Sequence, residues 1–180
     1  MQKTEIRMTG SGGQGVIMGT IILAEAAFDD GKQVVQCQAY GPEARGGSSK
    51  AEAIISDSKI SYTKVIYPDL LLSLTQQSFD KYVKELKADT VIVADSRIVV
   101  PEEILKGYKV YSIPILDSAK NVIKNKMSAN IISCGAVNAL TGVCSEDALK
   151  RAVLEHVPKE TAESNLAALA LGGELVTSHK

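Results

Sequence analysis

Cysteine and histidine are scarce in this sequence, which has three cysteines and two histidines among 180 residues. The cysteines, Cys37, Cys134 and Cys144, are odd in number, and none of them forms a CxxC pair. This argues against a disulfide framework, a zinc site or an iron–sulfur cluster, so we expect buried thiols. The two histidines, His156 and His179, offer little material for a metal or catalytic centre. We therefore predict that this chain binds no metal.

Long apolar runs and an excess of charge are also lacking. No apolar stretch approaches the roughly 20 residues of a membrane span, and the first residues include Lys3, Glu5 and Arg7 rather than a secretory apolar block. The net charge of −1 gives no general attraction to nucleic acid or to an anionic membrane. We therefore expect a cytoplasmic protein that binds neither of them, and in which any anion site is local.

The length and composition are typical of one soluble globular domain. The 180 residues are 45% hydrophobic and 23% charged, which is enough apolar material for a proper core. There is no internal repeat, low-complexity tract or linker-like composition. We therefore predict a single domain over residues 1–180.

Strand-like and helix-like segments alternate along the chain. Strands are predicted at 5–8, 33–38, 50–56, 70–74, 90–94 and 108–113, and helices at 16–28, 76–87, 129–143, 145–157 and 161–171. Strands 70–74 and 90–94 are apolar on both faces, which is typical of a parallel sheet covered by helices on each side. The first strand, helix and second strand together predict a βαβ unit. The whole pattern predicts an α/β fold of three layers, with a largely parallel or mixed sheet, helices on both faces and an open strand order.

A glycine-rich loop separates the first predicted strand from the first helix. Gly10, Gly12 and Gly15 match the Rossmann-like spacing G-x-G-x-x-G, in which a phosphate can approach the helix N-terminus. A dinucleotide site also needs an acidic residue at the end of the second strand, and residues 36–39 contain none. No Lys-Ser or Lys-Thr pair follows, so a Walker A motif is excluded. The glycines could equally serve to pack the helix and another subunit.

A second glycine-rich stretch, Tyr-Gly-Pro-Glu-Ala-Arg-Gly-Gly, follows the second predicted strand. Arg45 is its only cation and could bind a phosphate or carboxylate, or pair with Glu43 or with another subunit. Gly46 and Gly47 can adopt positive φ, and Tyr40 could stack on a ligand or bridge core and solvent. Because both stretches follow strands, we expect them to lie at one edge of the sheet, where they would form an anion site.

Other polar residues at predicted strand ends are weaker candidates. Asp69, Asp95 and Ser96 would line the same edge, or would serve as helix caps and turn formers. Cys134 lies in an apolar helix without a nearby histidine, which favours an inert buried thiol over a nucleophile. No triad or carboxylate pair is present in the sequence pattern, so no catalytic residue is assigned.

The order and spacing of several segments resemble the gamma subunit of 2-oxoacid:ferredoxin oxidoreductases. The matching segments are residues 10–16, 22–27, 38–47, 50–52 and 68–69. The resemblance implies an α/β subunit that works with alpha and beta partners, and leaves a ferredoxin-like delta partner open. Such an enzyme oxidatively decarboxylates a 2-oxo acid, such as pyruvate, onto coenzyme A and reduces ferredoxin. The stretch 40–52 is most like the 2-oxoglutarate branch.

The resemblance also implies where the cofactors are and what the glycine stretches do. Thiamine diphosphate is expected between the alpha and beta subunits and the iron–sulfur clusters in other subunits, so this chain binds no cofactor alone and is not catalytic alone. We expect the two stretches to face the partners and to position coenzyme A or shield the thiamine intermediate from water. The candidate binding residues are Gly10, Gly12, Gly13, Gln14, Gly15, Tyr40, Glu43, Arg45, Gly46 and Gly47.

Three alternatives stay open at this level. The chain could belong to an indolepyruvate oxidoreductase, it could be a free-standing nucleotide-binding protein, or it could act only as a scaffold in its complex. An isolated chain could also form a homodimer through the surface meant for its partners.

Overall fold

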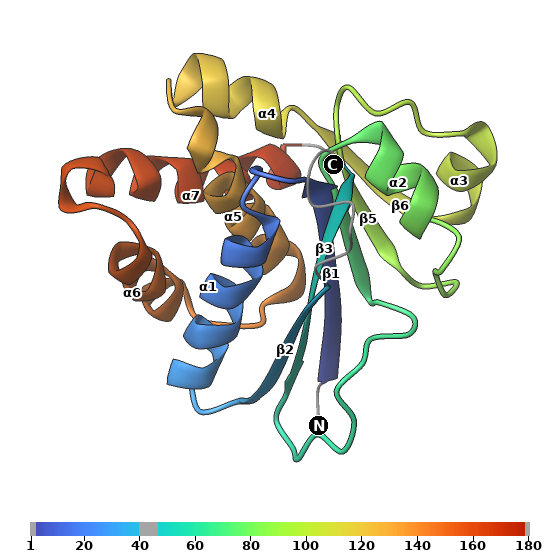
Figure 1. Cartoon of the computed structure of the whole chain (residues 1–180), viewed down its shortest axis with the longest axis horizontal. Helices are drawn as coiled ribbons and strands as arrows, with labels where there is room; N and C mark the ends of the chain where they lie inside the picture. Colours follow the sequence, from blue (N-terminus) through green and yellow to red (C-terminus); the bar gives the residue numbers. More distant parts are fainter. Residues whose placement is uncertain (1–2, 40–46, 179–180) are drawn as a thin grey trace.

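The computed structural model describes residues 3–39 and 47–178, which are built around one six-stranded sheet (Figure 1). The strands are β1 (Lys3–Ser11), β2 (Gln33–Ala39), β3 (Ser48–Ser56), β4 (Leu70–Ser73), β5 (Val91–Asp95) and β6 (Lys109–Ile113). Their order across the sheet is β2-β3-β1-β4-β5-β6. β3 runs antiparallel to both of its neighbours, and the other pairs are parallel. The sheet is therefore mixed.

The βαβ unit predicted for the N-terminal segment needs correction. β1 and β2 run in the same direction, but they are not neighbours, because β3 lies between them. The short connection 40–47 favours antiparallel pairing of β2 with β3, from Gln33 opposite Ser56 to Ala39 opposite Lys50. β3 then pairs with β1 along the whole length of both strands. The insertion of β3 makes this part a split βαβ unit.

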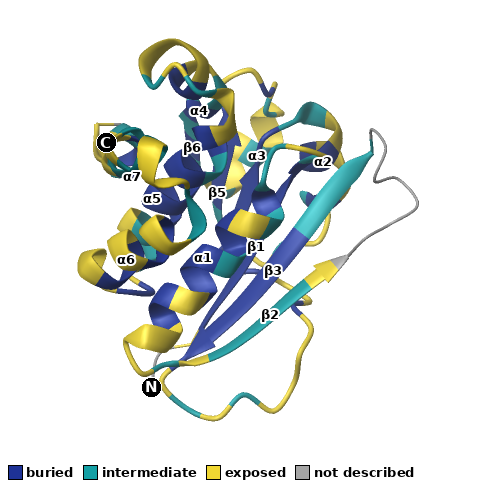
Figure 2. Cartoon of the chain, turned by 60° about the vertical axis from the view of Figure 1, so that its left-hand side comes forward, coloured by how far each residue is buried: buried dark blue, intermediate teal, exposed yellow. Residues whose placement is uncertain are grey.

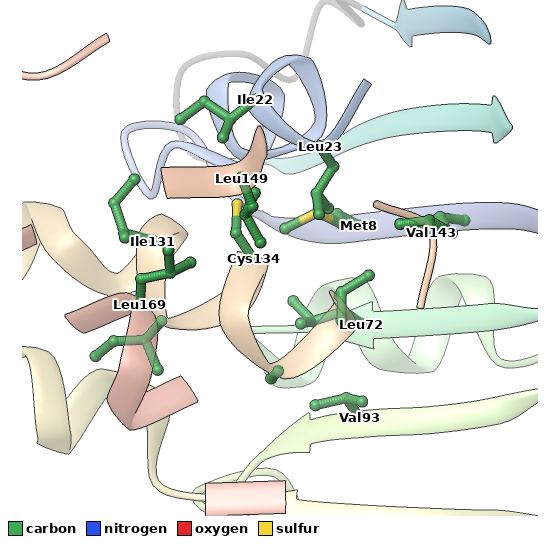
Figure 3. Close-up of a cluster of buried hydrophobic side chains, with 14 of the residues drawn as sticks. Met8, Ile22, Leu23, Leu72, Val93, Ile131, Cys134, Val143, Leu149 and Leu169 are labelled. Carbon is green, nitrogen blue, oxygen red and sulfur yellow. The ribbon is translucent and has the colours of Figure 1, made fainter. Parts of the chain in front are cut away.

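Helices cover both faces of the sheet, as predicted. One face carries α1 (Val16–Asp29), α5 (Ala129–Thr141), α6 (Glu146–His156) and α7 (Ala162–Thr177), and the other carries α2 (Gln76–Tyr82) and α3 (Glu102–Gly107). The larger core lies on the first face, where Met8, Leu72 and Val93 of the sheet meet side chains of α1, α5 and α7 (Figure 3). Phe79 and Ile92 lie in the smaller core on the second face.

Three regions differ from the helices expected from the sequence. One is α3, which forms where no helix is predicted. The helix predicted over 76–87 ends at Tyr82, although Val83 and Leu86 still pack against the core in the turns that follow. Residues 115–128, for which no element is predicted, form the short helix α4 (Ile115–Asp117), a π-helical turn (Ser118–Val122) and a 3-10 turn (Lys126–Ser128). A further 3-10 turn, Lys159–Thr161, precedes α7.

The second face of β1 and β3 holds a buried arginine. Arg7 is 1% exposed, and its guanidinium donates to Glu52 Oε1 (2.7 Å), to Glu85 Oε2 (2.8 Å) and to the carbonyl oxygen of Val65 (3.1 Å). These bonds tie β1 to β3, to the turn after α2 and to the segment 57–69. No helix in the described part of the chain is long and apolar enough to cross a membrane.

Candidate anion-binding site

The first glycine loop connects β1 to α1 and is closed by a side chain. Gln14 folds back so that its Oε1 accepts a hydrogen bond from the backbone N–H of Ser11 at 2.7 Å. A Cβ on Gly10 would lie 2.5 Å from that oxygen, so only glycine leaves room for the folded Gln14. Gly15 is the N-cap residue of α1 and has a φ of 72°, and a Cβ there would lie 2.9 Å from Nδ2 of Asn130 in α5. Gly10 and Gly15 therefore serve the local fold.

Gly12 and Gly13 are exposed between these two packed glycines. Gly13 has a φ of 87°, and no atom lies within 4 Å of the place where its Cβ would be. The first turn of α1 has neither an acidic residue nor a side-chain cap. The positive end of the helix dipole is therefore not neutralised locally, which favours a negative group beside this part of the loop.

A cavity of about 380 Å³ lies beside the loop and is lined by three cations. Arg97 follows β5, Lys120 lies in the π-helical turn, and Lys126 begins the 3-10 turn. The rest of the lining comes from Gly13, Gln14, Leu116 and Met127. Neither lysine forms an ion pair with any residue in 3–39 or 47–178. The cavity is thus locally positive in a chain whose net charge is −1.

Asp95 acts as a turn and cap residue at this edge. It is 1% exposed, and its Oδ1 accepts from the backbone N–H and from Nε of Arg97, at 3.2 and 2.9 Å. Its Oδ2 accepts from the backbone N–H of Leu116 at 2.8 Å. One buried carboxylate thereby fixes both Arg97 and the start of α4. Ser96 is exposed, and its backbone N–H bonds to the carbonyl oxygen of Ile113.

The prediction that Asp69 lies at the same edge is wrong. β4 runs parallel to β1, with Ile6 opposite Leu70, so Asp69 precedes β4 at the amino end of the strands. There its carboxylate accepts from the backbone N–H of Glu5 at 2.7 Å and pairs with Lys87. The error arose because an aspartate beside a strand marks a strand start as readily as a strand end.

The second glycine stretch is described only at its flanks. Tyr40, Glu43, Arg45 and Gly46 lie outside the described residues, so their role in the site stays a prediction. Gly47 directly precedes Ser48, which pairs with Ser11 at the end of β1. On the other side, Ala39 ends β2 opposite Lys50. Both flanks of the stretch therefore lie at the edge of the sheet from which the first glycine loop emerges.

Two of the three thiols are buried as expected and are unsuited to nucleophilic chemistry. Cys134 is fully buried and donates to the carbonyl oxygen of Gly19 at 3.3 Å (Figure 3). Burial raises its pKa far above the usual range, and burial raises the pKa of Cys144 to about 12. Cys37 is half-buried and donates to the carbonyl oxygen of Thr63. Among the described residues, no cluster of His, Cys, Asp and Glu is arranged to hold a metal ion.

Sequence reasoning missed the three cations of the cavity. Arg97 follows a predicted strand at the edge where the glycine loop lies, so its position carried a usable signal. Lys120 and Lys126 carried none, because they belong to the segment 115–128 for which no regular element is predicted.

Comparisons with known proteins place the chain in a family. The family model for pyruvate ferredoxin/flavodoxin oxidoreductase matches residues 5–175. A 2-oxoglutarate synthase subunit KorC of Methanocaldococcus jannaschii is 43% identical over 175 residues, covering 96% of this chain and 94% of that protein. The gamma subunit of a keto/oxoacid ferredoxin oxidoreductase from Geobacter sulfurreducens is 44% identical, with a TM-score of 0.85, and covers 97% of this chain and 99% of that one.

A longer enzyme chain contains the same fold. The solved structure of 2-oxoglutarate:ferredoxin oxidoreductase from Magnetococcus marinus, with 2-oxoglutarate, coenzyme A and succinyl-CoA bound, matches 99% of this chain with a TM-score of 0.90 and 25% identity. This chain corresponds to 32% of that one. With the family model covering nearly all of its residues, the chain belongs to the pyruvate ferredoxin/flavodoxin oxidoreductase family.

Proposed function

We propose that this chain is the gamma subunit of a 2-oxoglutarate:ferredoxin oxidoreductase. Such an enzyme decarboxylates 2-oxoglutarate, transfers the succinyl group to coenzyme A and passes the electrons to ferredoxin. Support comes from the 2-oxoglutarate synthase subunit and the oxoacid oxidoreductase gamma subunit that match almost the whole chain. This agrees with the branch expected from residues 40–52. The comparisons do not favour the indolepyruvate enzyme or a free-standing nucleotide-binding protein.

In this proposal the chain has an accessory role in the cytoplasm. The alpha and beta subunits hold thiamine diphosphate between them and carry out the decarboxylation, while the iron–sulfur clusters lie in other subunits, among them a ferredoxin-like delta subunit. The thiols of Cys134 and Cys144 are buried and have raised pKa values, which is consistent with a chain that does not carry out the chemistry itself. What this chain contributes is a positively charged surface beside the partners' active site.

The cation-lined cavity gives this surface a specific task, which is to hold coenzyme A by its phosphates. Arg97, after β5, and the two lysines of the segment 115–128, Lys120 and Lys126, line one cavity with Gly13 and Gln14, and this observation carries the proposal. Lysine and arginine form strong charge-assisted hydrogen bonds with phosphate oxygens, and the start of α1 adds its dipole.

The apolar part of the same cavity suits the rest of the molecule. Leu116 and Met127 lie beside the cations and offer contact area for the adenine ring or the pantetheine arm. Ala39 and Ser48, on either side of the second glycine stretch, end and begin strands at this edge, and the proposal assigns Arg45 the role of a further cation. The chain would thereby orient coenzyme A so that its thiol reaches the thiamine intermediate in the partner subunits.

The test is a lysine double variant in the reconstituted enzyme. Lys120→Ala combined with Lys126→Ala should raise the KM for coenzyme A by about ten-fold or more, equivalent to about 1.4 kcal/mol of lost binding. The kcat should change little, because the reacting groups lie in other subunits. Lys106→Ala is the matched control, since Lys106 is exposed and its ion-pair partner among residues 3–39 and 47–178 is exposed Glu102. An unchanged KM in the double variant would contradict the binding role.

Membership of the complex is tested separately. Purification through a tag on this chain should recover polypeptides with thiamine and cluster motifs, together with oxidation of 2-oxoglutarate that depends on coenzyme A. Calorimetry of the isolated chain with nucleotides serves as the opposing test. Tight binding of a dinucleotide, without any co-purifying subunit, would favour the free-standing alternative.

A further inference from the structure

The outer edge of β2 has no strand paired with it in the described structure, although Cys37 Sγ donates to the carbonyl oxygen of Thr63 in the segment 57–69. β2 is the last strand of the sheet at this side (Figure 2). Its seven residues include no charge and no proline, and its register with β3 is continuous, without a bulge. Proteins usually protect an edge with one of these features, because free N–H and C=O groups pair with other chains. β6, at the opposite side, is shorter and begins with Lys109.

An apolar stripe on α1 lies beside this edge. The stripe consists of Ile17, Ile21, Ala24 and Phe28, which recur at helical spacing and share one side of the helix. The residues that meet the neighbouring helices lie on other sides, as Gly19 faces Cys134 of α5 and Glu25 pairs with His156 of α6. Helical geometry therefore turns the stripe away from α5 and α6, toward the β2 edge. Phe28 is 68% exposed there.

The middle residue of β2 carries an unsatisfied hydrogen-bond donor. Gln36 Nε2 is buried and has no acceptor among the described residues. Gln36 lies opposite Ala53 of β3, whose side chain is in the core beneath α1, so the amide is on the same face as the apolar stripe. A buried donor without an acceptor destabilises the folded chain, because the group has lost its hydrogen bonds to water. Rotation of the side chain toward the open edge would let it reach an acceptor on another chain.

We propose that two copies of this chain associate through β2, antiparallel, about a two-fold axis at Gln36. In this register Gln36 of one copy lies opposite Gln36 of the other. Val35 lies opposite Cys37 of the other copy, and Val34 lies opposite Gln38 of the other copy. No charges oppose each other, and each Gln36 amide finds a carboxamide oxygen in the other copy. A symmetric interface needs a surface that is complementary to itself, and this strand meets that requirement.

The stripe on α1 completes the interface. A stable interface buries roughly 1,200 Å² or more, which exceeds what one seven-residue strand provides. Because Gln36 and the stripe share a face of the sheet, antiparallel pairing of the two β2 strands brings the two α1 stripes together on that face. The proposal uses neither the glycine loop nor the cation-lined cavity, so it can fail while the proposed function holds, and the reverse.

Cysteine cross-linking of the full-length chain tests this register. In a Cys37→Ser background, Gln36→Cys should form an intermolecular disulfide on mild oxidation, because directly opposed residues have Cβ atoms about 4.5–5.5 Å apart. Gln38→Cys is the control on the same face of the sheet. In this register the two Gln38 residues lie four positions apart along the paired strands, about 14 Å, which is too far for a disulfide. Equal cross-linking of both variants, or cross-linking of Gln38→Cys alone, would overturn the proposal.

Sedimentation equilibrium gives a second readout without cross-linking. The wild-type chain should have twice its 19.2 kDa mass. Gln36→Lys sets two like charges against each other and should weaken the dimer about ten-fold or more, whereas Gln33→Lys at the strand start should not. Thermal unfolding of each variant confirms that the monomer is folded. A wild-type chain that stays monomeric, or that pairs through β2 only with another subunit, would refute the two-fold dimer.

Discussion

Gly172→Ala tests the close packing of α5 against α7. α5 and α7 cross where Gly135 and Gly172 let their backbones approach, and a Cβ on Gly172 would lie 2.0 Å from the carbonyl oxygen of Ile132 and 2.9 Å from the backbone nitrogen of Ala136. Ordinary contact begins near 3.4 Å, so the helices must move apart by more than about 1 Å. Both atoms are backbone, so no side-chain rotation relieves the clash.

The expected cost follows from two opposing effects. Overpacking of a core costs about 1–3 kcal/mol, and a backbone clash this close belongs at the upper end. Alanine in place of glycine inside a helix returns up to about 1 kcal/mol. The free energy of unfolding should therefore fall by about 2 kcal/mol, which lowers Tm by about 4–8 °C in a domain of this size.

The neighbouring glycine provides the control. A Cβ on Gly173 meets nothing closer than Ala139 Cβ at 3.8 Å, so Gly173→Ala should keep the helix gain and raise Tm by about 2–4 °C. Thermal and urea unfolding of the two variants against the wild type measure the difference. If Gly172→Ala were as stable as Gly173→Ala, the close approach of α5 and α7 would be wrong.

Two further predictions concern buried charge and buried thiols. Arg7→Met removes one of two cationic partners of buried Glu52 and leaves Lys50 at 3.1 Å, so the free energy of unfolding should fall by about 3 kcal/mol in urea titrations, the lower end of the range for a broken buried pair; a loss as small as that of exposed Lys106→Met would contradict the buried ion pair. For Cys144, burial raises the pKa from 9.0 to about 12, so between these values the unfolded chain releases a proton that the folded chain keeps. Stability should therefore fall as pH rises above 9. Above pH 9, the free energy of unfolding should fall less steeply with pH in Cys144→Ala than in the wild type. Identical slopes in the two proteins would contradict the burial of Cys144.

Local patterns in the sequence predicted most of the elements. The strands at 70–74 and 90–94 agree with β4 and β5 within one residue at each end, because continuous apolar runs mark strands buried on both faces. The cap at Ser145 was also predictable, and its hydroxyl accepts from the backbone N–H of Ala148 at 3.2 Å. The family resemblance is confirmed by the family model and by relatives that cover nearly the whole chain.

Long-range pairing was not predictable in the same way. The short connection 40–47 favours pairing of β3 with β2, but no local pattern encodes the pairing of β3 with β1, which places β3 between the two strands. The site shows the same limit, because the glycine loop is a local motif, whereas Lys120 and Lys126 reach the cavity only through the fold of the segment 115–128. Asp69 was assigned to the wrong edge of the sheet. The edge at which Asp69 lies depends on the direction of β4 relative to β1, the strand from which the glycine loop emerges.

A structure of the assembled enzyme with coenzyme A bound would decide whether this chain holds that substrate. The account predicts a phosphate of coenzyme A within about 2.7–3.2 Å of the amino group of Lys120 or Lys126, beside Gly13. Coenzyme A held entirely by other subunits, with this cavity facing solvent, would contradict it.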